Sequence, residues 1–186
     1  MTRIIAGAAR GRRLAVPPRG TRPTSDRVRE AVFSALQSRL DFDDLAVLDL
    51  YAGSGALGFE ALSRGAGRAV LVDADAKAVA VINQNARAVG LPGATAHRRN
   101  ARTFLELPGE AFDLVFLDPP YDVPAATVDG DVAALAAGWL APGAHVVVER
   151  SARTPATTWP EGFDLDMSRD YGETRVEIAV WQDDRA

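Results

Sequence analysis

From residue 46 onward, short apolar runs alternate with stretches of helical periodicity. The short runs predict strands at 46–50, 68–72, 95–98, 112–117 and 145–149. Between them, apolar positions that recur every three or four residues predict helices at 56–64, 76–89, 101–107 and 131–140. Several of these strands are apolar on both faces, which is typical of a parallel sheet covered by helices on both sides. We therefore expect a doubly wound α/β fold.

The C-terminal part of the chain breaks this alternation. Two strand-like segments, 163–169 and 174–181, are joined through Tyr171 and Gly172 with no helix between them. Because so short a connection can only form a hairpin, the last two strands should run antiparallel to each other. The expected sheet is thus mostly parallel and seven-stranded, with an antiparallel hairpin at its C-terminal end.

The N-terminal part is expected to form a small element of its own. Residues 1–23 hold three glycines and three prolines, and apolar residues at 4–5 and 14–16 flank a glycine-containing stretch. This pattern predicts a small β-hairpin, followed by a helix at 25–39 whose start is capped by the oxygens of residues 24–26. We expect a hairpin arm at 1–23 and one α/β domain at 24–186.

The charge of the chain is unevenly distributed. The whole chain carries a formal charge of −4, yet its first 30 residues hold eight arginines against only Asp26 and Glu30. A basic arm on an acidic body points to a polyanionic partner, although a solvated basic terminus explains the pattern equally well. No apolar run is long enough to span a membrane and no apolar leader is present, so we expect a cytoplasmic protein.

Metal and thiol chemistry are not expected from this composition. The chain has no cysteine, which excludes disulfide scaffolds, thiolate metal sites and cysteine nucleophiles. Its two histidines, His97 and His145, lie in apolar strand-like stretches with no second ligand close by in the sequence. We therefore expect both histidines to be structural and predict no metal site.

A glycine-rich turn follows the first strand of the expected sheet. Gly53, Gly55 and Gly58 form the pattern G-x-G-x-x-G between that strand and a helix, where glycine permits a sharp turn and close approach of a ligand. This pattern alone also suits a dinucleotide whose ribose is held by Asp73, at the end of the second strand. Asp49, at the end of the first strand, would oppose a pyrophosphate and favour a ligand that carries positive charge.

S-adenosylmethionine combines a ribose and an adenine with a cationic amino-acid and sulfonium end. Asp49 near the amino-acid end and Asp73 at the ribose fit this cofactor together, while a turn carboxylate and a helix cap are their alternative interpretations. Asn100, after the third strand, is placed to meet the adenine, and capping the next helix explains it equally well. The candidate cofactor-binding residues are Asp49, Ala52, Gly53, Ser54, Gly55, Asp73, Ala74, Asn100 and Ala101.

The tetrad Asp118-Pro119-Pro120-Tyr121 directly follows the fourth strand and should face the same crevice. The prolines fix the backbone and donate no hydrogen bonds, which leaves the Pro119 carbonyl as a rigid acceptor beside the Asp118 carboxylate. Tyr121 offers a face on which a flat ring can stack. Two acceptors and a stacking surface suit a planar group that bears an NH₂. By holding the two N–H groups, the acceptors would aim the nitrogen lone pair at a cofactor methyl. These four residues are the catalytic candidates.

The tetrad matches the (D/N)-P-P-(Y/F/W) signature of class I, Rossmann-like amino-methyltransferases that use S-adenosylmethionine. The chain further resembles the RsmD family over nearly its whole length. The resemblance lies in residues 3–7, 10–14, 49–55 and 61–66, and above all in the Arg-Pro-Thr-Ser-Asp-Arg-Val-Arg-Glu stretch at 22–30. Where this chain has Asn100, the family often has an aspartate.

The resemblance to the RsmD family implies a specific reaction. It implies methylation of the exocyclic N2 of one guanine, position 966 in standard numbering, of small-subunit ribosomal RNA in the assembled subunit. The basic arm would then engage RNA phosphates. The candidate RNA contacts are Arg3, Arg10, Arg12 and Arg13. Arg22 either joins this group or closes over the cofactor together with Thr24.

Three other functions remain open at the level of sequence. The same amino-methylation chemistry could act on adenine or cytosine in DNA, although 186 residues leave little room for a separate target-recognition domain. A nicotinamide-dependent oxidoreductase would use the glycine turn, but no typical catalytic pattern accompanies it. An RNA-binding module without activity would keep its affinity after Asp118→Ala.

Overall fold

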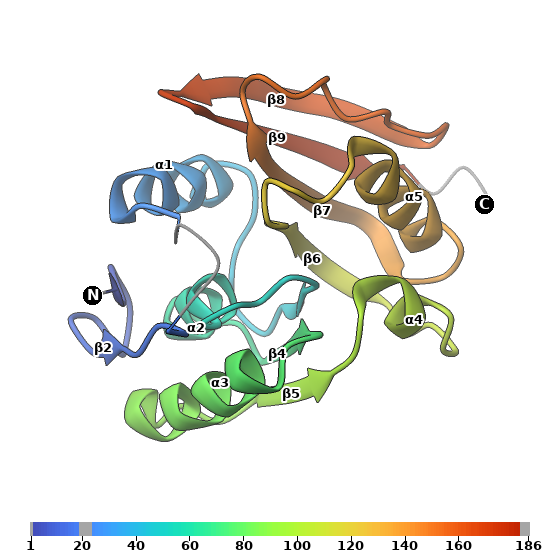
Figure 1. Cartoon of the computed structure of the whole chain (residues 1–186). Coiled ribbons are helices and arrows are strands. Elements are labelled where there is room, and N and C mark those ends of the chain that lie inside the picture. Colours follow the sequence, from blue (N-terminus) through green and yellow to red (C-terminus); the bar gives the residue numbers. More distant parts are fainter. Residues whose placement is uncertain (1, 19–23, 183–186) are drawn as a thin grey trace.

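A seven-stranded sheet forms the centre of the molecule in a computed structural model that describes residues 2–18 and 24–182 (Figure 1). Its first five strands in the chain are parallel, and β9 pairs antiparallel with both β7 and β8. The strand order is β5-β4-β3-β6-β7-β9-β8. The strands are β3 (Ala46–Asp49), β4 (Arg68–Asp73), β5 (Ala94–Arg98), β6 (Phe112–Leu117), β7 (Leu140–Ser151), β8 (Phe163–Tyr171) and β9 (Thr174–Trp181).

Helices cover both faces of the sheet and give it two separate apolar cores. One core joins the sheet to α1, α2 and α3, and the other joins it to α4 and α5. Neighbouring residues of β3 divide between them, with Val47 in the first core and Leu48 in the second. The helices are α1 (Asp26–Gln37), α2 (Ala56–Ser63), α3 (Ala76–Val89), α4 (Ala101–Leu105) and α5 (Ala125–Leu135).

The expected fold class, the seven strands and the C-terminal hairpin are confirmed, and one predicted helix is misplaced. The helix expected at 131–140 runs instead over α5 and has ended before Trp139. At Gly138, which has a φ of 131°, the backbone is no longer helical. The Trp139 indole then packs on Phe104 and donates to the Leu105 carbonyl at 3.2 Å. Ala136 and Ala137 favour a helix, so the sequence pattern does not reveal that the helix ends before them. Leu140 therefore begins β7.

The predicted N-terminal hairpin is confirmed, and it lies against the body of the molecule. Its strands β1 (Thr2–Arg3) and β2 (Arg13–Leu14) pair antiparallel. Ile4, Ala9 and Leu14 are buried in the same core as α1 and α2. The boundary expected at residue 23 falls in the stretch 19–23, outside the described residues, so the division into arm and domain stays a prediction.

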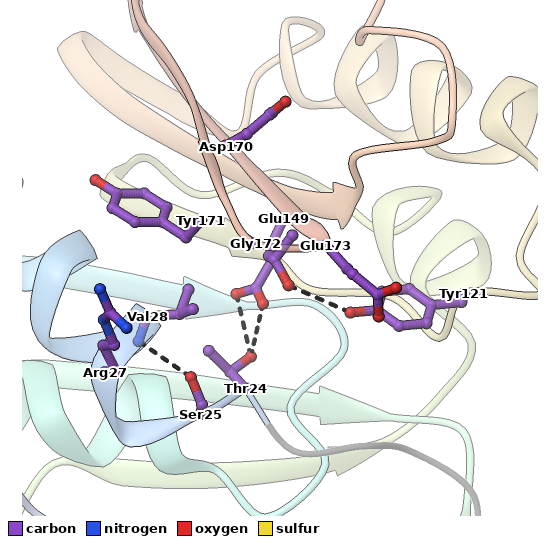
Figure 2. A pocket seen from close by; sticks show the side chains of 11 residues that line it. Thr24, Ser25, Arg27, Val28, Tyr121, Glu149, Asp170, Tyr171, Gly172 and Glu173 are labelled. Atoms are coloured by element: carbon purple, nitrogen blue, oxygen red, sulfur yellow. Dashed lines mark hydrogen bonds between the residues drawn. The ribbon is translucent and has the colours of Figure 1, made fainter.

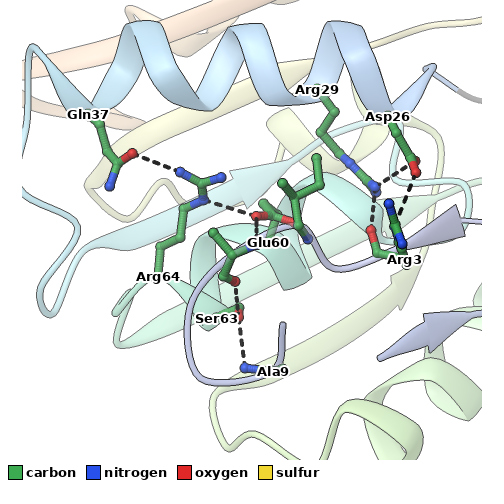
Figure 3. A network of polar contacts seen from close by, with 10 residues as sticks. Arg3, Ala9, Asp26, Arg29, Gln37, Glu60, Ser63 and Arg64 are labelled. Atoms are coloured by element: carbon green, nitrogen blue, oxygen red, sulfur yellow. Dashed lines mark hydrogen bonds and ion pairs between the residues drawn. The ribbon is translucent and has the colours of Figure 1, made fainter. Parts of the chain in front are cut away.

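Polar contacts with α2 hold the hairpin in place (Figure 3). The buried Glu60 carboxylate accepts hydrogen bonds from the backbone amides of Ile5 at 2.8 Å and Ala6 at 3.0 Å, and pairs with Arg64 at 3.0 Å. The Ser63 hydroxyl accepts from the Ala9 amide at 2.9 Å. Because these partners are buried, losing one would leave an unpaired polar group away from water.

No helix of residues 2–18 and 24–182 has both the length and the apolar character needed to cross a membrane.

Gly7 sets how closely the hairpin can approach α2. Its φ is 85°, and a Cβ added there would lie 1.7 Å from the Ser63 carbonyl oxygen. Gly11 has a similar φ of 82°, but a Cβ there would meet nothing within 4 Å. Gly7→Ala should therefore displace the hairpin and cost about 3 kcal/mol, whereas Gly11→Ala should cost only the backbone strain of about 1 kcal/mol. Urea unfolding of both variants tests this, and equal losses would contradict it.

Candidate active site

Five polar side chains gather where the parallel strands end. Asp49, Asp73, Asn100, Asp118 and Glu149 stand at or just after the carboxyl ends of β3, β4, β5 and β6 and near that of β7. The strand order reverses at β3, because β4 lies on one side of it and β6 on the other. A cavity of about 580 Å³ opens at this edge. Ligands of open α/β sheets bind at such a reversal.

The glycine turn is pinned over the end of β4. The Ala52 amide donates to the Val72 carbonyl at 3.0 Å, and the Gly53 amide donates to the Asp73 carboxylate at 2.9 Å. Gly53 has a φ of 57° and nothing within 4 Å of its Cβ position, so it presents bare backbone to the cavity it lines. Gly55 caps α2, and a Cβ there would lie 2.6 Å from the Phe59 ring. Gly53 thus faces the cavity, while Gly55 serves packing.

The structure distinguishes Asp73 from a helix cap. Its second carboxylate oxygen accepts from the Asp75 amide at 2.9 Å, while Asp75 itself caps α3. Asp73 therefore organises the turns on both sides of the cavity instead of starting a helix. Asn100 does cap its helix, since its side chain accepts from the Arg102 amide at 2.8 Å, and it also lines the cavity.

Asp49 is a buried carboxylate at the floor of this edge, next to the cavity but not among the residues that line it. Neither of its oxygens has hydrogen-bonding geometry to any described residue, although the backbone amides of Gly58 and Tyr51 face it. Burial, and then the charge of Asp118, raise its pKa to about 8. Such a carboxyl is more easily ionised once a cation lies beside it.

A hydroxyl connects two further acids. The Thr24 hydroxyl lies 2.6 Å from a carboxylate oxygen of Asp118 and 3.1 Å from both carboxylate oxygens of Glu149. Burial raises the pKa of Asp118 to about 6, and burial followed by the charge of Asp118 raises that of Glu149 to about 9. With a proton on Glu149, one chain of donors can run from Glu149 through Thr24 to an ionised Asp118.

The segment after Asp118 forms the rim of the cavity. Pro119 and Pro120 both line it. The Pro120 carbonyl accepts from the Val123 amide at 3.0 Å, whereas no described residue donates to the Pro119 carbonyl. Tyr121 is half exposed (Figure 2), and its hydroxyl lies 3.4 Å from that of Thr174. The Pro119 carbonyl, a fixed acceptor that no described residue uses, therefore lies along the chain between the buried Asp118 carboxyl and the accessible Tyr121 ring.

Most residues expected at a cofactor and catalytic site do lie together. The cavity is lined by Thr24, Ala52, Gly53, Ser54, Asp73, Ala74, Asn100, Ala101, Asp118, Pro119, Pro120 and Tyr121. Asp49 and Gly55 lie behind this lining. In residues 2–18 and 24–182 no group of three histidine, aspartate or glutamate side chains is arranged to hold a metal ion.

The arginines expected to contact RNA have different surroundings. Arg10 and Arg13 are exposed on the hairpin. Arg12 donates to the Ala88 and Val89 carbonyls at 3.0 and 2.7 Å and so fastens the hairpin to the end of α3. Arg3 lies 3.8 Å from Asp26. Arg22 falls outside the described residues.

Sequence reasoning missed two residues that shape the site. The buried Asn85 of α3 donates to the Ser54 carbonyl at 2.8 Å and exchanges hydrogen bonds with Ala15, which links the glycine turn to the segment after the hairpin. Nothing in the sequence marks this bridge. Glu149 could have been found, since it ends the strand expected at 145–149, on the same edge as the other acids.

The whole chain has relatives of similar length. A family model described as "Conserved hypothetical protein 95" matches residues 2–180. Proteins named ribosomal RNA small subunit methyltransferase D, from Escherichia coli K12 and Haemophilus influenzae, are each 37% identical to it. The matches cover 95% and 91% of this chain and 88% and 89% of theirs. The chain belongs to the RsmD family. This membership confirms the expected enzyme class, a methyltransferase.

Solved structures agree with membership of the RsmD family. One from Escherichia coli, 35% identical, superposes with a TM-score of 0.85 over 97% of this chain and 98% of that chain. Magnesium protoporphyrin IX methyltransferase from Synechocystis, solved with S-adenosylmethionine bound, is 19% identical, with a TM-score of 0.65 over 84% of this chain and 79% of its own. The second likeness is one of fold alone, and both are consistent with a Rossmann-like methyltransferase sheet.

The raised pKa of Asp49 predicts a pH-dependent stability. Between an unfolded value of about 3.9 and the folded value of about 8, the folded protein holds a proton that the unfolded chain has released, so stability falls as pH rises through this range. Asp49→Asn removes this loss. We expect the variant to gain stability over wild type as pH rises from 4 to 8, on the order of 1 kcal/mol per pH unit at most.

Urea unfolding at several pH values measures this difference. Asp164→Asn, on the exposed face of β8, is the control and should follow wild type at every pH. A constant difference between Asp49→Asn and wild type would contradict burial of an ionisable Asp49.

Proposed function

We propose that the protein transfers a methyl group from S-adenosylmethionine to the exocyclic N2 of a guanine in small-subunit ribosomal RNA, at position 966 in standard numbering and in the assembled subunit. One observation carries this proposal: the Asp118-Pro119-Pro120-Tyr121 rim shares a cavity with the glycine turn and Asp73. The names of the RsmD relatives from Escherichia coli and Haemophilus influenzae support the RNA.

The residues at the sheet edge fit S-adenosylmethionine. No described Lys or Arg side chain pairs with the buried Asp49 carboxylate, so a cation beside it would be stabilised, and the amino-acid end of this cofactor carries one. Asp73 and Asn100 line the cavity where hydroxyl groups and an adenine would need polar partners. The same acids would repel a pyrophosphate, which argues against a nicotinamide dinucleotide. When bound, S-adenosylmethionine supplies an electrophilic methyl group.

Asp118 and Pro119 have the geometry to orient an amino group. The Asp118 carboxylate and the free Pro119 carbonyl can each accept one N–H, while the Tyr121 ring supports the flat base. Both acceptors draw the nitrogen lone pair out of conjugation and fix its direction. Catalysis on this proposal is mainly positioning and electrostatic complementarity.

The hairpin gives the site a basic border. Thr2 and Val16, at the two ends of the hairpin, line the cavity, and Arg10 and Arg13 are exposed near them along the chain. Phosphate contacts of such arginines position an RNA without reading its sequence. The acidic cavity and the basic hairpin would thus bind different parts of one substrate. The target base must be unstacked or already exposed to reach Asp118.

Replacing Asp118 tests the proposed reaction. With labelled S-adenosylmethionine and small ribosomal subunits from a strain that lacks the enzyme, wild type should form N2-methylguanine. Asp118→Ala should lower the rate at least about 100-fold, because it removes a preorganised acceptor from the reacting amine. Cofactor affinity, measured by calorimetry, should change little.

Asp164→Ala, an exposed change on β8, serves as the matched control and should keep full activity. Nucleoside analysis that finds no N2-methylguanine with wild type, while another methyltransferase labels the same subunits, would overturn the proposed substrate.

Replacing the exposed hairpin arginines tests the RNA contact. The double variant Arg10→Ala/Arg13→Ala should weaken RNA binding and reduce the slope of log affinity against log salt by about 1.5, since two phosphate contacts are lost. Arg169→Ala, an exposed arginine on β8, should leave the slope unchanged. Filter binding over a range of salt concentrations measures both, and equal slopes in the double variant and wild type would contradict the contact.

A further inference from the structure

A second cavity of about 500 Å³ adjoins the first. It lies between the start of α1 and the turn that joins β8 to β9, as Figure 2 shows. Thr24, Tyr121 and Glu149 line both cavities. These three residues form the shared wall of the two cavities.

The shared wall lies between the residues expected to bind the cofactor and the second cavity. The glycine turn, Asp73 and Asn100 line only the first cavity. Asp118 also lines the first cavity, but it is joined to the wall through the Thr24 hydroxyl. An amino group held by Asp118 would therefore lie next to this wall, with the second cavity on the other side of it.

The lining of the second cavity suits a flat group rich in N–H donors. Its described lining holds three acids, Glu149, Asp170 and Glu173, and one cation, Arg27, so carboxyl oxygens that can accept from N–H groups outnumber cations there. Tyr121 and Tyr171 add two aromatic rings. Nucleobases stack on such rings, and those with N–H groups on their pairing edge can donate to a carboxylate.

Glu149 is the acid best placed to accept a hydrogen bond from the pairing edge of a base. It is only 6% exposed, and its one hydrogen-bond partner in the described part of the chain is the Thr24 hydroxyl. Asp118 and Glu149 lie against that same hydroxyl, so they present two neighbouring acceptors. Guanine carries a matching pair of neighbouring donors, the ring N1–H and the 2-amino group.

We propose that the second cavity receives the target guanine and that Glu149 determines its recognition by accepting the ring N1–H while Asp118 holds the 2-amino group. This inference rests on the proposed guanine N2 methylation. It adds a specificity-determining residue outside the Asp118–Tyr121 segment. Adenine lacks both donors at these positions and would leave a buried acid unpaired, so the site would reject it.

Guanine recognition by Glu149 should depend on pH. Burial and the charge of Asp118 raise the Glu149 pKa to about 9, so in the free protein at neutral pH the carboxyl is protonated. Its O–H can donate to the Thr24 hydroxyl, which leaves the other carboxyl oxygen free to accept from N1–H. An ionised Glu149 accepts more strongly than a protonated one, so KM should fall as pH rises toward 9. Around Glu149 lie Asp118 after β6, Arg27 of α1, Tyr121, Asp170 and Tyr171 of β8, and Glu173 of the β8–β9 turn. Three arginines act on these acids: Arg150 lowers the pKa of Asp118, Arg175 pairs with Asp170 and Arg153 pairs with Glu173.

A base analogue separates this inference from the proposed reaction. 2-Aminopurine keeps the 2-amino group but has an acceptor at N1, where guanine has a donor. Small subunits reconstituted with guanine or with 2-aminopurine at the target position are methylated with labelled cofactor. Wild type should prefer guanine about 100-fold in kcat/KM, because the Glu149 oxygen that accepts N1–H in guanine would face a lone pair in the analogue.

Glu149→Gln should reverse much of this preference, because the amide can donate to N1. We expect the ratio of guanine to 2-aminopurine activity to fall about 100-fold and KM for guanine to lose its pH dependence. The amide has the same shape, so thermal stability and cofactor affinity should be retained. Asp164→Asn, an exposed carboxyl on β8 that lines neither cavity, is the control and should keep the wild-type ratio.

The outcomes distinguish the two proposals. If wild type does not label guanine, the proposed function fails. If wild type labels guanine but accepts 2-aminopurine within threefold, recognition by Glu149 is overturned without any variant. An unchanged ratio in a folded Glu149→Gln, or loss of activity on both bases with intact cofactor binding, overturns it as well.

Discussion

The reversal of strand order at β3 is the constraint on which the site depends. Because β3 lies between β4 and β6, the connections after these strands leave in different directions and open a crevice above their carboxyl ends. Asp49, Asp73 and Asp118 come from segments far apart in the chain, and the sheet alone brings them to one edge. Hydrogen bonds from the Ala52 and Gly53 amides then fix the glycine turn against this edge.

The burial of the acids at this edge lowers the stability of the folded protein. Asp49, Asp118 and Glu149 are all buried, and each has a raised pKa, so they retain protons that free carboxyls would lose. No lysine or arginine side chain forms an ion pair with these acids in the described part of the chain. The site is therefore arranged to gain favourable interactions when a cation and N–H donors enter, which agrees with the proposed cofactor and acceptor.

The hairpin contributes to the site through its attachment to the body. Glu60 and Ser63 of α2 hold its backbone, Arg12 fastens it to α3, and Asn85 connects the following segment to the glycine turn. A hairpin that was not attached to the body would contribute its charge but would not line the cavity. The docked hairpin does both, since it borders the cavity and carries exposed arginines.

The sequence by itself determined the sheet, its parallel and antiparallel parts and about half of the cavity lining, because apolar periodicity and glycine and proline positions act locally. It placed α5 wrongly, since alanine favours a helix on either side of its true end, and the packing of Trp139 on Phe104 just beyond that end is a contact between distant segments. Tertiary structure alone decided the docking of the hairpin by Glu60, the Asn85 bridge and the meeting of Thr24, Asp118 and Glu149. Each of these joins residues more than 30 positions apart, and no local pattern encodes such contacts.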